Sequence, residues 1–357
     1  MTHHLAKIAL TEMQAELRDQ AMRFCADKSP VSTVRALLDD ERGFDAGVWA
    51  EMAELGWLGI ATPEEQGGLG LDLADVVPVA EAMGKHLMNS PFASITLAAQ
   101  AILFGGSDAQ KAEWLPKLAS GTIGTVALFE PSGAWDLSAV EGKAKTFVLN
   151  LDAAEIVVTT VRHEAEVRLA LIPRAALTPE RETIIDETKR SYRFDVPDVT
   201  EDMLMPSELT PAALERIELV ANLLQSAELS GAAQACVDYT VDYLKTRKQF
   251  GKTIGAFQAL KHPTVDAFVG AEDARSLLYA AATHCEKQGE GEIAVRMANA
   301  KAEGALSYAA DRSIQFHGGF GFTYDCDAQL YRRVAMFAAS QFGDAAFHRA
   351  RLAELLL

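Results

Sequence analysis

The 357-residue chain has few cysteines, an excess of acidic over basic residues and no long apolar run. Its cysteines lie far apart without a CxxC pair, a spacing that indicates neither a disulfide framework nor a zinc site; they are Cys25, Cys236, Cys285 and Cys326. The net charge of −17 argues against nucleic-acid binding, because a phosphate backbone requires a dense basic stripe. No apolar stretch reaches the roughly 18 residues of a membrane span, and the Met-Thr-His-His start argues against a signal peptide. We therefore expect a cytoplasmic globular protein with no nucleic-acid partner and no membrane span.

The order of helical and strand-like segments predicts an α+β fold with three domains. Helical apolar spacing runs from Leu10 to about Ser120 and resumes at Pro211, and β-rich segments lie between these points. This order is typical of α+β layers rather than of alternating βαβ units. We predict an N-terminal helical domain (1–121), a small middle β domain (122–206) and a C-terminal helical domain (207–357). The strands are expected at 125–129, 146–149, 156–160, 167–172, 183–185 and 192–196. Ser107 is expected to cap a helix that begins at Asp108.

The stretch from Lys245 to His262 closes a long helical segment and gathers positive charge. The preceding apolar face predicts a helix that ends at Gly251 with a cationic cluster around its end. The cations are Lys245, Arg247, Lys248 and Lys252. A capped surface helix would explain them, because cations stabilise any helix C-terminus. An anion site would also explain them, because a guanidinium can hold a phosphate through two hydrogen bonds. The residues that would add an apolar wall and an amide are Phe250, Phe257 and Gln258.

A second stretch, Gln315-Phe-His-Gly-Gly-Phe-Gly-Phe322, combines closely spaced glycines with a histidine. It does not follow a strand, so a Rossmann fingerprint is excluded by its context. Glycines at this spacing can mark a tight turn, or can let backbone N–H groups approach a phosphate. His317 is either a catalytic base or a polar group packed next to a bound cofactor.

A third stretch, Phe129-Glu-Pro-Ser-Gly-Ala-Trp-Asp136, closes a strand with a polar turn. Its Trp135 could stack on a ring system or pack a domain boundary.

Taken in order, four stretches resemble signatures of the acyl-CoA dehydrogenase family, and the resemblance runs over nearly the whole chain. Residues 56–70, Gly-Trp-Leu-Gly-Ile-Ala-Thr-Pro-Glu-Glu-Gln-Gly-Gly-Leu-Gly, resemble the N-terminal-domain signature. Residues 114–121 lead, as in the family, into a strand and a Glu-Pro turn. Arg247-Lys-Gln-Phe-Gly251 with Phe257-Gln258, and Gln315 with Gly318-Gly319, resemble the two C-terminal signatures.

The resemblance implies a fold, a cofactor and a set of contacts. The fold would be an N-terminal helical domain, a middle β domain and a C-terminal four-helix bundle, with FAD held between subunits. The residues that would hold the ADP part of a neighbour's flavin are Arg247, Gln249, Phe250, Phe257 and Gln258. Gln315, Gly318 and Gly319 would reach the same group from another chain. Phe129 and Ser132 would lie near the flavin on the β-domain side.

The implied reaction is the α,β-dehydrogenation of an acyl-CoA thioester. A carboxylate removes the α-proton while the β-hydride passes to the flavin, so the site must be dry and must stabilise an enolate-like charge. Electrons then leave to an electron-transfer flavoprotein, which is an implied partner together with the acyl-CoA substrate.

The chain departs from the family pattern at the catalytic base. Most members carry a Glu in a Tyr-Glu-Gly run, and that position here is Phe342; a minority place it before the Arg-x-x-Phe-Gly motif, and that position is Ala221. Neither side chain can take a proton. Carboxylates that could serve after a shift of helix register are Glu215, Glu218, Glu228 and Asp344. The middle domain is also short, and Phe147-Val-Leu149 replaces the flavin-stacking Trp-Ile-Thr strand.

Three hypotheses follow. In the first, the chain is the shorter, base-lacking subunit of a heterotetrameric acyl-CoA dehydrogenase, as in relatives that shorten steroid side chains, and it contributes flavin contacts to a longer partner. In the second, it is a scaffold that binds no flavin. In the third, it forms a homo-oligomeric enzyme with a relocated base such as Glu228 or His317.

Overall fold

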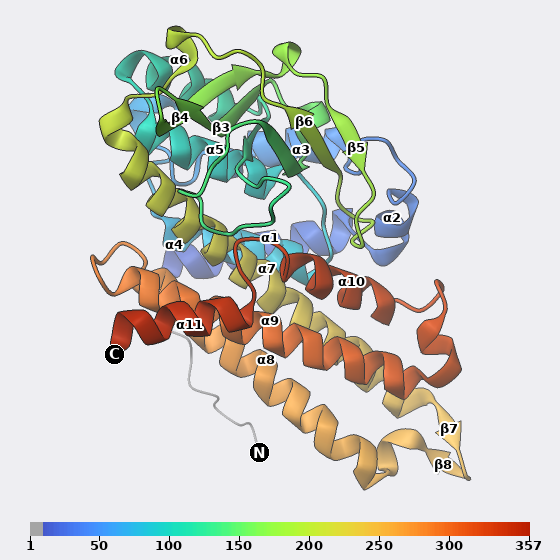
Figure 1. Ribbon diagram of the computed structural model, residues 1–357. Helices are drawn as coiled ribbons and strands as arrows, with labels where there is room; N and C mark the ends of the chain where they lie inside the picture. The colour runs from blue at the N-terminus through green and yellow to red at the C-terminus, as the bar shows by residue number, and fades with distance from the viewer. Residues whose placement is uncertain (1–9) are drawn as a thin grey trace. The chain divides into compact units, whose positions relative to one another are not determined.

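The computed structural model describes residues 10–357, and its elements follow the order helical, β-rich, helical (Figure 1). The predicted α+β class is therefore confirmed. The predicted boundaries after residues 121 and 206 stay predictions, and residues 1–9 of the first predicted domain lie outside the described part. Within residues 10–357, no helix combines the length and the apolar character that crossing a membrane requires.

The helices before the strands are α1 (Glu12–Lys28), α2 (Val31–Ala36), α3 (Ala46–Glu54), α4 (Leu73–Lys85), α5 (Phe92–Gly105) and α6 (Asp108–Ala119). The strands of the middle are β1 (Gly124–Ala127), β2 (Ala144–Leu149), β3 (Ile156–His163), β4 (Glu166–Pro173), β5 (Glu180–Glu182) and β6 (Ser191–Asp195). The C-terminal elements are α7 (Thr210–Thr246), β7 (Lys248–Gln249), β8 (Lys252–Thr253), α8 (Gln258–His284), α9 (Gly291–His317), the 3₁₀ turn η8 (Gly318–Phe322), α10 (Ala328–Ala338) and α11 (Ala345–Leu356).

The chain divides into two compact units. One, the bundle unit, combines the chain up to Val31 with residues 74–88 and 222–357; the other, the sheet unit, combines residues 32–73 and 89–221. Each unit is thus built from segments that are distant in the sequence.

In the bundle unit, α8 and α9 lie side by side along their length and α10 and α11 pack on α9 (Figure 1). Most side chains of the core between α7, α8, α9 and α10 are alanines, which let the helix axes approach closely. Helices α4 and α7 come closer still, at two glycines. A Cβ on Gly84 would lie 2.0 Å from the Glu228 carbonyl oxygen, and one on Gly231 would lie 2.0 Å from the Glu81 carbonyl oxygen.

A buried carboxylate joins three helices of the bundle unit. Glu81 of α4 is 3% exposed and accepts hydrogen bonds from Arg275 Nε (2.7 Å) and Tyr279 Oη (2.5 Å), both on α8. Arg18 Nε of α1 also donates to it, at 3.3 Å. The two guanidinium groups compensate the buried charge, so the cluster ties α1, α4 and α8 together.

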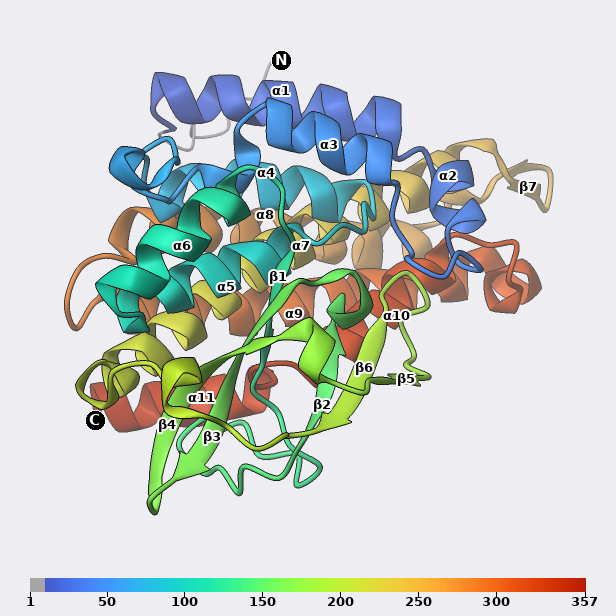
Figure 2. The ribbon, with the colours of Figure 1, turned by 90° about the horizontal axis from the view of Figure 1, so that it is seen from above.

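The sheet unit holds two three-stranded sheets, in the orders β1-β3-β4 and β2-β6-β5 (Figure 2). Strands β1 and β3 are parallel, and the other pairs are antiparallel. Apolar side chains of both sheets, among them Val148, Val157 and Phe194, form one core. The expected strand at 183–185 was wrong. The ladder with β6 ends at Glu182, and Ile185 beyond it is 44% exposed, because a β-branched residue forms a strand only where it has a partner strand.

Candidate functional site

The cationic stretch after α7 is a β-hairpin, not a helix end. Helix α7 ends at Thr246, and strands β7 and β8 then pair antiparallel around Phe250 and Gly251. These two residues have φ angles of 51° and 80°, the left-handed pair that a tight two-residue hairpin turn requires. The prediction that the helix runs to Gly251 was therefore wrong. Glycine adopts this conformation without strain, whereas Phe250 is held in it against its own preference.

The two C-terminal stretches line one pocket of about 860 Å³ within the bundle unit. Its lining residues are Tyr243, Arg247, Gln249, Phe250, Ile254, Phe257, Ala259, Leu260, and residues 315–320. The resemblance implied that the two stretches reach a flavin from different chains. The structure brings them together on one chain, so a single chain can supply both sets of groups. Gln258 is outside this lining, and its Oε1 lies 3.2 Å from His262 Nε2.

The pocket combines one cation, two side-chain amides, an aromatic wall and open glycine backbone. Phe250 at the hairpin tip is 88% exposed, its ring lies edge-on to that of Phe257 at 6.1 Å, and Lys252 Nζ lies 4.3 Å from the Phe257 ring centre. A Cβ on Gly318 or Gly319 would meet no other atom within 4 Å, so the backbone there is open to a ligand. Gly318 has φ 63° and ψ −140°, a conformation that only glycine adopts readily. A planar base, a sugar and phosphates would all find matching groups here.

His317 lies at the wall of this pocket and is 4% exposed. Its ring stacks on Tyr243 and Tyr239, with centroid distances of 4.0 and 4.8 Å, and Nδ1 lies 2.7 Å from the carbonyl oxygen of Ser313. Burial lowers the pKa of His317 below its ordinary value, against the smaller opposing effect of the Ser313 carbonyl. The sequence reasoning missed the two tyrosines. Their signal was their spacing of four residues on α7, one turn apart and just before Arg247.

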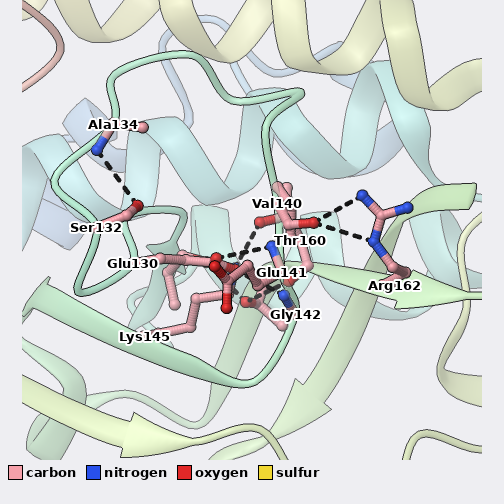
Figure 3. Close-up of polar contacts among 11 residues, drawn as sticks. Glu130, Ser132, Ala134, Val140, Glu141, Gly142, Lys145, Thr160 and Arg162 are labelled. Carbon is pink, nitrogen blue, oxygen red and sulfur yellow. Dashed lines mark hydrogen bonds and ion pairs between the residues drawn. The ribbon is translucent and has the colours of Figure 1, made fainter.

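Phe129 and Ser132 belong to the sheet unit, and Ser132 lies in the loop that follows β1 (Figure 3). Phe129 is buried, whereas Ser132 is exposed and its Oγ accepts from the backbone N–H of Ala134 at 3.5 Å. Between them, Glu130 is buried and receives three donors: Lys145 Nζ (2.7 Å) and the backbone N–H groups of Glu141 (2.8 Å) and Gly142 (2.9 Å). The Glu130 carboxylate therefore holds the two ends of the loop together, because its donors lie at residues 141–145.

Lys145 is fully buried and also donates to Thr160 Oγ1 at 2.8 Å (Figure 3). Burial raises the pKa of Glu130, but the hydrogen bonds from Lys145 and the loop backbone outweigh it and hold this pKa below its ordinary value. Burial also lowers the pKa of Lys145 more than Glu130 raises it. Sequence reasoning missed this pair, because nothing near Lys145 in the sequence distinguishes it from a solvated lysine.

The two positions predicted to match the family's catalytic base hold apolar side chains. Phe342, in the bundle unit, has φ 53°, and Gly343 after it has φ 104°; a Cβ on Gly343 would lie 2.3 Å from the ring of Phe347. Ala221, in the sheet unit, is 4% exposed on α7. Of the nearby carboxylates, Asp344 caps α11 by accepting from Phe347 N–H at 2.7 Å, and Glu215 is exposed.

Comparison with known proteins assigns the chain to a family. The model of the acyl-CoA dehydrogenase N-terminal domain matches residues 11–122, and that of the C-terminal domain matches residues 215–357. Acyl-CoA dehydrogenase IpdE2 of Mycolicibacterium smegmatis is 32% identical over 336 residues, which cover 94% of this chain and 96% of that protein. The chain belongs to the acyl-CoA dehydrogenase family, a family of flavoprotein oxidoreductases whose cofactor is FAD.

Solved structures agree on the fold. The Tcur3481-Tcur3483 steroid acyl-CoA dehydrogenase, in a G363A variant, is 26% identical with a TM-score of 0.86, and the match covers 97% of this chain and 98% of that one. The ChsE4-ChsE5 complex from Mycobacterium tuberculosis has a TM-score of 0.87 at 22% identity, with 98% of each chain covered. The pocket groups fit the cofactor of the family, because the open backbone at Gly318 and Gly319 leaves room for phosphate oxygens beside Arg247.

Proposed function

We propose that the chain is the base-lacking subunit of a heteromeric acyl-CoA dehydrogenase, and that its hairpin and glycine turn hold the ADP half of an FAD in the active site of a longer partner. The partner carries the catalytic Glu. The single observation that carries this proposal is that the residues of both C-terminal signatures line one pocket, while the two base positions hold Phe342 and Ala221.

Retention of the pocket argues against a flavin-free scaffold. Phe250 stays in a left-handed conformation that costs about 1 kcal/mol or more, and its ring is 88% exposed, which brings no burial in return. Strain at a side chain that stays this exposed is typical of ligand-binding positions. A scaffold would gain stability from Asn or Gly at this position.

The absence of a base at the usual positions argues against independent turnover. A base that takes an α-proton must sit in a dry site with its pKa tuned to the task. Asp344 is occupied as a helix cap, and Glu215 is exposed to water. His317 lines the pocket that we assign to the nucleotide, among groups suited to phosphate and ribose.

In the proposed complex, this chain's residues bind and orient rather than react. Arg247 pairs with the phosphates through its guanidinium, and the backbone of Gly318 and Gly319 accommodates their oxygens. Gln249 and Gln315 offer amides to the ribose, and Phe250 and Phe257 provide faces for the adenine. We place Phe129 and Ser132 near the flavin on the sheet-unit side. FAD, when bound, supplies the hydride acceptor.

Two structural relatives support a heteromeric assembly and a substrate class. The steroid acyl-CoA dehydrogenase at 26% identity is named for two components, and ChsE4-ChsE5 is a complex. We therefore propose a steroid-derived acyl-CoA as substrate. As electron acceptor we propose an electron-transfer flavoprotein, which the family resemblance implies. A panel of CoA thioesters, from butyryl-CoA to steroid side-chain CoA esters, tests the substrate class; fastest turnover of a straight-chain ester would contradict it.

The assembly is tested by co-expression with the longer acyl-CoA dehydrogenase-like protein encoded nearest to this chain. FAD per chain is measured from the visible spectrum of the purified complex, and acyl-CoA-dependent dye reduction is measured in parallel. We expect about half a flavin per chain, and loss of most of it in Arg247→Ala, because a charge-assisted hydrogen bond to phosphate is worth about 1.5–3 kcal/mol.

The matched control is Lys248→Ala, which removes the same charge from the same hairpin at a residue outside the pocket lining. It should keep its flavin. One flavin per chain with turnover by this protein alone would support a relocated base instead, and a colourless, inactive complex would support the scaffold.

A further inference from the structure

The imidazole of His317 is a buried polar group that the proposed function leaves without a role. It lies at the pocket wall, and its Nε2 has no hydrogen-bond partner among the residues that the structure describes. Buried acceptors without partners are costly and rare, so such an atom at the wall of a ligand pocket points to a ligand group.

The protonation state of this ring follows from its other nitrogen. Nδ1 lies 2.7 Å from the Ser313 carbonyl oxygen, and a carbonyl only accepts, so Nδ1 carries the hydrogen. Burial disfavours a second proton by lowering the pKa of the ring. Nε2 therefore presents a lone pair: it can accept a hydrogen bond but cannot donate one.

The ring cannot easily turn to satisfy Nε2 elsewhere. It stacks on Tyr243 at 4.0 Å and on Tyr239 at 4.8 Å, and the Nδ1 bond fixes the remaining rotation. The ring of Phe320 is tilted against the imidazole, with 6.3 Å between the ring centroids. Phe320 also lines the pocket and is 45% exposed between Gly319 and Gly321, so a small rotation of its side chain admits a ligand group.

We propose that His317 Nε2 accepts a hydrogen bond from a hydroxyl or amine of the adenosine half of the bound nucleotide. This inference rests on the proposed function, since it takes the pocket to be the ADP site. The phosphates are then recognised by a cationic donor, and the adenosine half by a neutral acceptor. Arg247 attracts the phosphates, whereas an unprotonated imidazole repels phosphate oxygens and accepts only from a donor.

The test is calorimetric binding of four nucleotides to the full-length chain: ADP, 2′-deoxy-ADP, 3′-deoxy-ADP and inosine diphosphate, which lacks the adenine amine. We expect one of the three analogues to bind about ten-fold more weakly than ADP, as the loss of one hydrogen bond predicts. That analogue identifies the donor.

Two substitutions of His317 distinguish loss of the Nε2 acceptor from loss of the packing of the ring. His317→Asn keeps a donor for the Ser313 carbonyl but removes the Nε2 acceptor, so ADP affinity should fall about ten-fold to the level of the discriminated analogue. His317→Gln places an amide oxygen near the position of Nε2 and should restore most of the discrimination.

The inference is wrong if His317→Asn binds ADP like the wild type, or if it weakens all four nucleotides equally, as a packing defect would. Arg247→Ala should weaken all four. Failure of ADP to bind the wild-type chain would overturn the ADP site together with this inference, whereas Arg247-dependent binding that is indifferent to His317→Asn would overturn this inference alone.

Discussion

At the scale of single residues, the space around a helical glycine decides its effect on stability. Gly231 sits where α7 crosses α4, and a Cβ there would lie 2.0 Å from the carbonyl oxygen of Glu81 and 2.7 Å from the backbone nitrogen of Lys85. Gly304 also lies inside a helix, α9, but a Cβ there would meet no other atom within 4 Å. The two residues share a backbone conformation and differ only in their surroundings.

We predict that Gly231→Ala and Gly304→Ala change stability in opposite directions. Gly231→Ala forces backbone atoms of α4 and α7 apart, so it should lower the free energy of unfolding by about 3 kcal/mol. Gly304→Ala should raise it by about 1 kcal/mol, because alanine has the higher helix propensity. Urea unfolding followed by circular dichroism measures both. Equal effects would mean that the close crossing of α4 and α7 is wrong.

At the scale of secondary-structure elements, α9 and α11 are joined by a buried histidine. His348 of α11 is 0% exposed, and its Nδ1 lies 3.3 Å from an Nη of Arg296 on α9. Arg296 also pairs with Glu292 at 2.7 Å. Burial, and then the positive charge of Arg296, lower the pKa of His348 to about 4, while Asp344 and the Gly343 backbone oppose the shift.

This histidine predicts a pH dependence of stability with a defined sign. Unfolded His348 takes up its proton near pH 6.5, whereas folded His348 stays neutral until about pH 4. Its contribution is therefore fully present above pH 6.5 and is lost as the pH falls toward 4, by an amount on the order of 3 kcal/mol. Unfolding midpoints between pH 7.5 and 4.5 measure the slope, and His348→Gln should flatten it. An equal slope in both proteins would assign the effect to other groups.

The elements that sequence reasoning placed correctly are those with local signals. Ser107 caps α6 through Gln110 as predicted, because a capping box needs only adjacent residues. The end of α7 was placed five residues late, because the left-handed turn at Phe250 is imposed by the hairpin against the preference of phenylalanine. Residue 185 was assigned to a strand although the pairing of β5 with β6 stops at Glu182.

For the candidate site too, the features with local signals were predictable and those set by tertiary packing were not. Its residue types and spacing are visible in the sequence, and the family they resemble is confirmed. That the hairpin and the glycine turn share a pocket depends on how α7, α8 and α9 pack, which no local pattern encodes. The roles of Arg247, Gln258, Phe129 and the other site residues stay predictions.

At the scale of the whole molecule, the bundle unit is assembled from three separate segments, and Glu81 links all three. It belongs to the middle segment, Arg18 to the first, and Arg275 and Tyr279 to the last. Because this carboxylate is buried, removal of its charge leaves two guanidinium groups without their counter-ion.

We predict that Glu81→Gln lowers the free energy of unfolding by about 3 kcal/mol. The control is Glu113→Gln, which breaks the exposed Lys117–Glu113 pair (3.0 Å) and should cost less than about 1 kcal/mol. Denaturant midpoints of the two variants measure the difference. Limited proteolysis should also cleave next to α1 sooner in Glu81→Gln. Indistinguishable variants would show that the cluster contributes no more than a surface pair.

Because the bundle unit is built from three separate segments, its parts are synthesised at different times. Arg18 leaves the ribosome about 250 residues before Arg275 and Tyr279, the groups that share its carboxylate. At about 5–20 residues per second, that interval lasts roughly 10–50 s. Until it ends, Glu81 of α4 lacks its partners Arg275 and Tyr279 on α8. Residues 32–221 are nearly all available to fold while the bundle unit waits for the last third of the chain. The nascent protein is therefore a natural client for chaperones, and slow translation of its final third prolongs that dependence.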